Sequence, residues 1–178
     1  MLLSIVYYEK INIIGSLKFS MISIRKVTKK NFRDFKHLYT EGRRSFVRFR
    51  DEEDNWTLKP ERFLEGDKYF AYVLYKDGRV IAYLANVLDF KKKGVAKLHA
   101  GEVKKKFRGR GYGIKINRFV IKKMKEKGYK KIVVRTWSSN QASQGMFKKL
   151  GFEKYRTIKN NRVNGDDSVW WRMRIGKD

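Results

Sequence analysis

A cluster of glycines stands between residues 103 and 113, in the segment Val-Lys-Lys-Lys-Phe-Arg-Gly-Arg-Gly-Tyr-Gly. The segment follows an expected strand and opens an expected helix, so the glycines lie at a helix N-terminus. Glycines let backbone N–H groups approach an anion closely, and the unpaired amides and dipole of a first helical turn favour phosphate oxygens. Arg108 and Arg110 add positive charge beside them. The pattern predicts a pyrophosphate site.

Familiar glycine motifs fit this cluster poorly. The glycines occupy positions 109, 111 and 113, which is not the G-x-G-x-x-G spacing of a dinucleotide-binding fold, and no acidic residue follows about twenty positions later to hold a ribose. No Gly-Lys-Ser/Thr follows either, which excludes a Walker loop. The run from Arg110 to Ile114 opens like an RNA-recognition signature, but Ile114 fills the slot of the second stacking aromatic and the later periodicity is helical. An RNA-binding module remains the alternative.

The strand expected before the glycines, residues 95–103, carries two groups that could accept a proton. His99 has an ordinary pKa near neutrality, about 6.5, and Glu102 is the only carboxylate in the strand. Alternation in a regular strand places His99 on the same face as Lys97. A bulge in the strand would change the side of the sheet to which these side chains point, and would favour Glu102 as the proton acceptor.

Composition excludes several other chemistries. The chain has no Cys and two His, His37 and His99, so it offers no thiol nucleophile and no cysteine-built metal site, and we expect no metal. A cysteine-free chain also suggests the cytoplasm, and no 18-residue apolar run predicts a membrane span. The net charge of +26 favours polyanions, and seventeen Lys and Arg lie between residues 91 and 131. Nucleic acid is therefore a secondary candidate partner.

Hydrophobic periodicity and turn residues predict an alternating order of strands and helices. The expected helices are 28–42, 60–65, 111–127 and 140–150, and the expected strands are 22–27, 69–75, 79–87, 95–103, 131–137 and two that flank Asn164-Gly165. This order indicates an α/β (α+β) fold, with helices on a mixed sheet. We expect one domain over residues 21–178, preceded by an N-terminal extension, residues 1–20.

Two motifs in this order resemble the GNAT superfamily of acetyl-CoA-dependent N-acetyltransferases. Arg108-x-x-Gly111-x-Gly113, just after the strand that ends at Val103, is similar to the family's pyrophosphate loop. The run Asn140-x-x-Ser143-x-x-Met-Phe147-x-Lys-x-Gly-Phe is similar to its second signature, a helix beside the pantetheine. The element order of residues 21–175 fits the same family, with a mostly antiparallel sheet flanked by helices on both faces.

The resemblance implies transfer of acetyl from acetyl-CoA to a primary amine by direct attack, and the charge of the chain favours a peptide or protein acceptor over a free polyamine. The only dense acidic patch, Asp51 to Asp54, is a candidate approach for the amine. A non-catalytic CoA-binding module is a further alternative. The resemblance implies cofactor contacts by twelve residues: Gly101, Val103, Arg108, Gly109, Arg110, Gly111, Tyr112, Gly113, Ile114, Asn140, Ser143 and Phe147.

The sequence departs from the family pattern at both catalytic groups. Lys97 stands where several members have a basic carboxylate, so we expect His99 to take the ammonium proton, with Glu102 in reserve. Phe147 stands where members often have a tyrosine that protonates the leaving thiolate. Tyr155, Tyr112 or water could replace it, and the acid stays unassigned.

Overall fold

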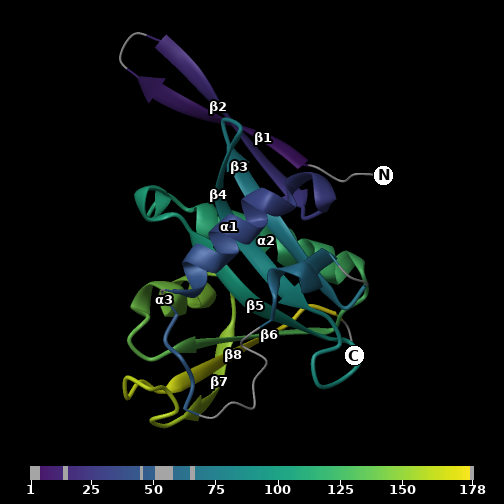
Figure 1. The fold of residues 1–178 in the computed structure, drawn as a ribbon, viewed down its shortest axis with the longest axis vertical. Coiled ribbons are helices and arrows are strands. Elements are labelled where there is room, and N and C mark those ends of the chain that lie inside the picture. Colours follow the sequence, from purple (N-terminus) through teal and green to yellow (C-terminus); the bar gives the residue numbers. More distant parts are fainter. Residues whose placement is uncertain (1–4, 14–15, 45, 51–57, 65–66, 177–178) are drawn as a thin grey trace.

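The computed structural model describes residues 5–13, 16–44, 46–50, 58–64 and 67–176. Its strands form one sheet in the order β1-β2-β3-β4-β5-β6-β8-β7 (Figure 1). All neighbouring strands are antiparallel except β5 and β6. The predicted mixed, mostly antiparallel sheet is therefore confirmed. The strands are β1 (Ile5–Ile13), β2 (Ser16–Lys26), β3 (Tyr69–Lys76), β4 (Arg79–Val87), β5 (Val95–Val103), β6 (Lys131–Trp137), β7 (Glu153–Ile158) and β8 (Ser168–Arg174).

Helices cover both faces of this sheet, as predicted. One face packs on α1 (Phe32–Arg43) and the short 3-10 helix η2 (Pro60–Leu64), and the other packs on α2 (Tyr112–Glu126) and α3 (Gln141–Lys149). Two further 3-10 turns, η1 (Lys29–Asn31) and η3 (Lys105–Phe107), precede α1 and α2. The apolar positions that predicted α2, Ile116, Val120 and Met124, are all buried against the sheet. Burial of this stripe is what fixes the helix there.

The strand predicted at residues 22–27 begins earlier in the structure, where it is part of β2. The alternation that starts at Ile22 marks only the part of β2 that pairs with β3, Ile22 to Lys26, whereas β2 itself starts at Ser16 and pairs with β1. In Figure 1 this β1/β2 hairpin projects from the body of the molecule. The expected boundary between residues 20 and 21 thus falls inside a strand.

The parallel pair β5 and β6 stays together for only four residue pairs, from Val95–Lys131 to Leu98–Val134. Beyond this point no pairing joins the two strands among the described residues. A bulge lies at the same place on the other edge of β5, because Ala85 of β4 pairs with Ala100 and Asn86 pairs with Leu98, which leaves His99 as an extra residue. The separation opens the sheet, and the bulge re-aims the side chains that follow it.

Candidate active site

A cavity of about 750 Å³ occupies the place where β5 and β6 separate. The ends of both strands, the glycine loop, the first turns of α2 and the face of α3 line it. Segments far apart in the sequence therefore converge on one cleft. Both candidate bases and every predicted cofactor residue except Arg110 line it, namely His99, Glu102, Gly101, Val103, Arg108, Gly109, Gly111, Tyr112, Gly113, Ile114, Asn140, Ser143 and Phe147.

The glycine loop has a geometry that suits a phosphate group. Gly109 and Gly111 have φ angles of 76° and 79°, and a Cβ built on either would meet no atom within 4 Å, so the space beside their amides is open. Gly111 is the N-cap of α2, which places the unpaired first-turn N–H groups on the cleft. A Cβ at Gly113 would stand 3.0 Å from Met146 Sδ, so Gly113 allows α2 to approach α3.

Another part of the cleft lining comes from α3. The Asn140 side chain accepts a hydrogen bond of 3.1 Å from the Ser143 backbone N–H and caps the helix, at the residue where the expected helix 140–150 begins. On α2, Asn117 donates to the Gly113 carbonyl at 2.8 Å, while its buried Oδ1 has no hydrogen-bond partner among the described residues. A buried, unsatisfied acceptor on a cleft wall is suited to a ligand's amide or hydroxyl donor.

The bulge at His99 puts both candidate bases on the same face of the sheet. Leu98 packs in the core beneath α2, whereas Ala100, two residues later, packs in the core beneath α1. The His99 ring contacts Phe63 on the α1 side, with centroids 6.2 Å apart. In a regular strand Glu102 would share the face of Leu98 and point toward α2. With the bulge, it points toward α1.

Glu102 is held in a fixed setting at the end of β5. Its side chain is 16% exposed, and Oε1 accepts a hydrogen bond of 2.8 Å from Arg108 Nη2. Arg108 also donates through Nε to the Val103 carbonyl at 2.9 Å. Burial raises the pKa of Glu102, Arg108 offsets part of this rise, and the charge of Glu41 adds to it. The raised pKa makes this carboxylate a better proton acceptor than an exposed one.

Most of the chain, including the segments that line this cleft, matches a known protein family. The family model of the acetyltransferase (GNAT) family matches residues 32–152. The chain belongs to this family. The predicted resemblance is thus confirmed, and the matched region includes α1, the β4–β5 bulge, the glycine loop and α3.

Individual relatives of the chain agree with this membership. An uncharacterized N-acetyltransferase of Methanocaldococcus jannaschii is 27% identical over 142 residues, which span 77% of this chain and 63% of that protein. N-alpha-acetyltransferase 30 of Schizosaccharomyces pombe is 31% identical over 64 residues, or 36% of this chain and 43% of that protein. The chain thus spans less than two thirds of the length of either relative.

Solved structures share the fold at low sequence identity. The structure of an acetyltransferase of Salmonella typhimurium with its cofactor acetyl-CoA matches with a TM-score of 0.71 and 18% identity. The match covers 88% of this chain and 95% of that chain. The fold of this GNAT chain is therefore that of known acetyltransferases.

The two departures from the family pattern have clear surroundings in this GNAT chain. Lys97 is 6% exposed, and its Nζ lies 4.3 Å from the centroid of Phe90 and 5.3 Å from that of Trp170. Phe147 is buried against Phe152 and Trp171, so the pocket has an aromatic ring but no hydroxyl there.

Of the tyrosines considered as replacements for the missing hydroxyl, Tyr112 lines the cleft. Tyr155 is not among the lining residues that the structure describes; it lies on β7, 39% exposed, beside Trp170. Proximity to the cleft therefore favours Tyr112 of the two.

Two residues to which no sequence signal pointed shape the surroundings of Glu102. Tyr83 is its cross-strand partner on β4, is 1% exposed, and has a buried hydroxyl without a hydrogen-bond partner in the part of the chain that the structure describes. Gly42 of α1 packs against both, because a Cβ there would lie 2.1 Å from Glu102 Oε2 and 2.9 Å from the Tyr83 hydroxyl. A register between distant strands gives no local sequence signal, so neither contact was predictable.

The described ranges hold neither a metal-binding cluster of side chains nor a helix that could span a membrane. Within them, no group of three or more His, Cys, Asp or Glu side chains is placed to hold a metal ion. None of the helices in these ranges is both long and apolar enough to span a membrane. The acidic patch from Asp51 to Asp54 lies outside the described residues.

Proposed function

We propose that this protein transfers an acetyl group from acetyl-CoA to a primary amine. The observation that carries the proposal is the convergence, in a single cleft, of an open glycine loop at a helix N-terminus and a half-buried carboxylate at the end of β5. Family membership supports the same reaction. Acetyl-CoA, when bound, supplies an acetyl group activated as a thioester.

The residues of the cleft suit this cofactor. The amides that follow Gly109 and Gly111, with the positive end of α2, would hold the pyrophosphate. The backbone of residues 99–103 has no β6 partner among the described residues, so its outward N–H and C=O groups remain for the pantetheine arm and the acetyl carbonyl. Asn117 Oδ1 would accept from a donor on the same arm.

We assign the base to Glu102 ahead of His99, reversing the order that the sequence favoured. Both side chains line the cleft on the same side of the sheet. Glu102 is the only carboxylate among the described lining residues, so it alone attracts an ammonium by opposite charge. Its burial raises its pKa, which makes it a stronger proton acceptor than an exposed carboxylate. A positioned base of this kind typically contributes about 10²–10⁴-fold to the rate.

Departure of the thiolate would use other groups. Phe147 supplies no proton, whereas the ring of Tyr112 belongs to the cleft wall at the start of α2. We assign Tyr112 as the candidate acid.

A peptide or protein amine is the preferred acceptor. The net charge of +26 disfavours encounter with a polycationic amine. The relative from Schizosaccharomyces pombe is named an N-alpha-acetyltransferase, which supports an N-terminal amine here. The absence of cysteine supports a cytoplasmic setting for such substrates.

The decisive experiment measures release of the CoA thiol together with the mass of the acceptor, across a panel of peptides and small amines. We expect one acetyl group added per thiol released for at least one peptide. Glu102→Gln is expected to lower kcat by about 10²-fold while acetyl-CoA still binds, and His99→Gln to have the smaller effect. Acetyl-CoA binding without transfer to any amine would contradict the proposal and favour a CoA-binding module.

RNA binding measured at rising salt, beside the amine panel, separates transfer from RNA binding. The segment after Gly111 is the helix α2, not the strand that an RNA-recognition signature needs. Any RNA binding by the basic surface is therefore expected to weaken steeply as salt is raised. Tight, sequence-selective RNA binding at high salt, without acetyl transfer, would overturn the enzymatic proposal.

A further inference from the structure

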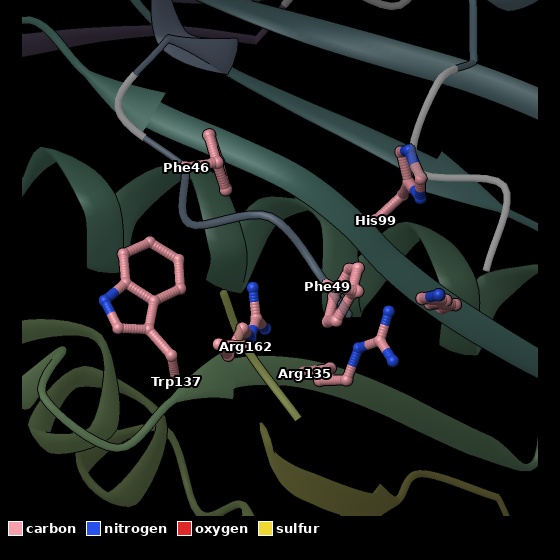
Figure 2. A pocket seen from close by; sticks show the side chains of 7 residues that line it. Phe46, Phe49, His99, Arg135, Trp137 and Arg162 are labelled. Carbon is pink, nitrogen blue, oxygen red and sulfur yellow. The ribbon is translucent and has the colours of Figure 1, made fainter. Parts of the chain in front are cut away.

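The basic side chains of this chain include some that are packed within the fold and others that are turned to solvent. Figure 2 shows the first kind, in a second cavity of about 20 Å³ that shares part of its lining with the cleft. There the guanidinium of Arg135 lies 3.5 Å from the centroid of Phe49, and that of Arg162, which is 1% exposed, lies 3.9 Å from the same ring. Cations packed in this way serve the interior of the protein.

The outer face of α2 carries cations of the second kind. Arg118, Lys122 and Lys125 follow one another at spacings of four and three residues, so they lie in one row along the helix. All three are exposed, and the helical period places their row opposite the apolar stripe that packs on the sheet. At 1.5 Å per residue the row spans about 10 Å of the helix.

Little negative charge offsets this row. Glu126 is the only acidic residue between positions 103 and 152. It accepts a hydrogen bond of 2.6 Å from Lys123, and the charge of Lys122 also acts on it. Neither Arg118 nor Lys125 forms an ion pair within the part of the chain that the structure describes. The row is therefore a site of net positive charge on the surface.

Positive charge continues past the end of the helix. Lys127 and Lys130 are exposed, and the Lys130 N–H donates to the Gly94 carbonyl at 3.1 Å. This hydrogen bond places the loop with three exposed lysines, at positions 91–93, beside the end of α2. We refer to eight residues together as the α2 basic surface, namely Arg118, Lys122, Lys125, Lys127, Lys130 and the lysines at 91–93.

The stability of the helix does not by itself explain the row. A cation in the last turn of a helix interacts favourably with the helix dipole, which accounts for Lys125. Arg118 and Lys122 lie before the last turn, and like charges four residues apart destabilise a helix slightly. Such charges are expected where a ligand uses them.

The chemistry of this surface favours phosphate groups over other anionic partners. A membrane-binding helix carries large apolar side chains beside its cations, and a stable protein interface has an apolar core. The large apolar side chains that are exposed among the described residues are Met21, Tyr155 and Val163, and none of them lies on α2. Single-stranded nucleic acid would need exposed aromatic rings on which its bases stack. A nucleic-acid duplex needs only cations, because its phosphates lie on the outside.

We infer that the α2 basic surface binds the phosphate backbone of double-helical RNA. An RNA duplex is A-form, and this form rises less per base pair than B-form DNA, so it presents more phosphates along the same length of a basic surface. Contacts to phosphates position a duplex without reading its sequence. No residue of the α2 basic surface is among the described residues that line the cleft, so the duplex and acetyl-CoA are expected to bind together.

The test measures binding of a short RNA duplex of mixed sequence, by fluorescence anisotropy, over a range of salt concentrations. A triple variant, Arg118→Gln with Lys122→Gln and Lys125→Gln, removes the row on α2. We expect it to lower the affinity by about 10²-fold in moderate salt and to reduce the slope of log K against log salt by about two to three, because three phosphate contacts are lost. A variant that exchanges Arg and Lys at the same three positions keeps the charges and is expected to bind like the unaltered chain.

A charge-matched control separates this site from the general attraction of a basic protein. Lys29, Lys30 and Arg33 are exposed at the start of α1, which packs on the other face of the sheet, and they form no ion pair among the described residues. Changing all three to Gln removes the same types and number of charges. We expect this control to lower the affinity for the duplex only slightly.

Equal losses of affinity in the two triple variants would overturn the inference, because the attraction would then come from net charge alone. Failure of the unaltered chain to bind the duplex in moderate salt would also overturn it. So would tighter binding to a DNA duplex of the same sequence, or to vesicles that contain phosphatidylserine. Acetyl-CoA binding and Tm are expected to be unchanged in both triple variants, which would show that the fold and the cleft are intact. None of these outcomes depends on acetyl transfer, so the inference and the proposed function can fail separately.

Discussion

Gly42→Ala offers a way to displace the proposed base without altering its chemistry. Gly42 is the penultimate residue of α1, and a Cβ there would lie 2.1 Å from Glu102 Oε2 and 3.2 Å from Glu102 Cδ. Ordinary contact between such atoms begins near 3.4 Å. The carboxylate must therefore retreat by more than an ångström, away from α1 and against the Arg108 guanidinium that holds its other oxygen.

A shift of this size is large for a catalytic group, because misplacement by about 1 Å can cost about 10²-fold in rate. We therefore expect Gly42→Ala to lower kcat by about that factor while the affinity for acetyl-CoA, measured by calorimetry, stays the same. The fold is expected to survive, since Ala favours a helix over Gly by up to about 1 kcal/mol and the displaced atoms end a flexible side chain. Thr40→Ala, at an exposed position of the same helix, controls for the change in helix propensity.

A double variant makes the test specific to Glu102. If Gly42→Ala acts only by moving this carboxylate, then adding it to Glu102→Gln costs nothing further, because the group it displaces no longer works as a base. Full activity of Gly42→Ala at an unchanged Tm would refute the reasoning. Additive losses in the double variant would also refute it, since they would mean that Gly42 acts through something else, for example the Tyr83 hydroxyl.

Two further variants probe the charge and the glycines of the same cleft. Arg108→Gln removes the cation that holds the pKa of Glu102 down, so at saturating acetyl-CoA the acidic limb of the kcat–pH profile should move to higher pH; a limb that stays in place or moves lower would contradict the ion pair's role. Gly111→Asp puts a negative charge in open space beside the start of α2, and should abolish acetyl-CoA binding in calorimetry while Tm changes little. Gly111→Asn, which has nearly the same shape and tolerates a positive φ, is the neutral control and should bind more tightly than the Asp variant; equal binding by the two would mean that no phosphate lies there.

Local signals in the sequence were enough to place most of the elements. The Asp77-Gly78 turn between two apolar runs predicted the β3/β4 hairpin, and both residues have the positive φ that such a turn needs. The stripe of Ile116, Val120 and Met124 predicted α2 to within one residue at each end. These signals act over a few residues, so they can be recognised without knowing which elements pack together in the fold. The predicted start of β2 was wrong. Alternation marks a strand with one buried face, and the residues before Ile22 lie outside the part of β2 that pairs with β3.

The glycine loop and the α3 cap were predictable for the same reason, since turn and cap chemistry is local. Gly111 is the N-cap of α2 with a positive φ, and Asn140 caps α3, each at the first residue of a helix that the sequence predicted. The facing of Glu102 was not predictable. It depends on the bulge at His99, which follows from how β5 registers against β4 and leaves no mark in the strand's own residues.

The bulge in β5 and the separation of β5 from β6 occur at the same point of β5, and together they create the candidate active site there. Parting alone would open the backbone of residues 99–103 toward the cleft but leave Glu102 facing the core under α2, where a charged carboxylate would be costly. A bulge alone would turn Glu102 toward α1 but leave no gap for a cofactor between the strands. Together they place an exposed backbone edge and a half-buried carboxylate within the same few residues. The proposed acetyl transfer to an amine would use both, one to hold the thioester and one to take the proton.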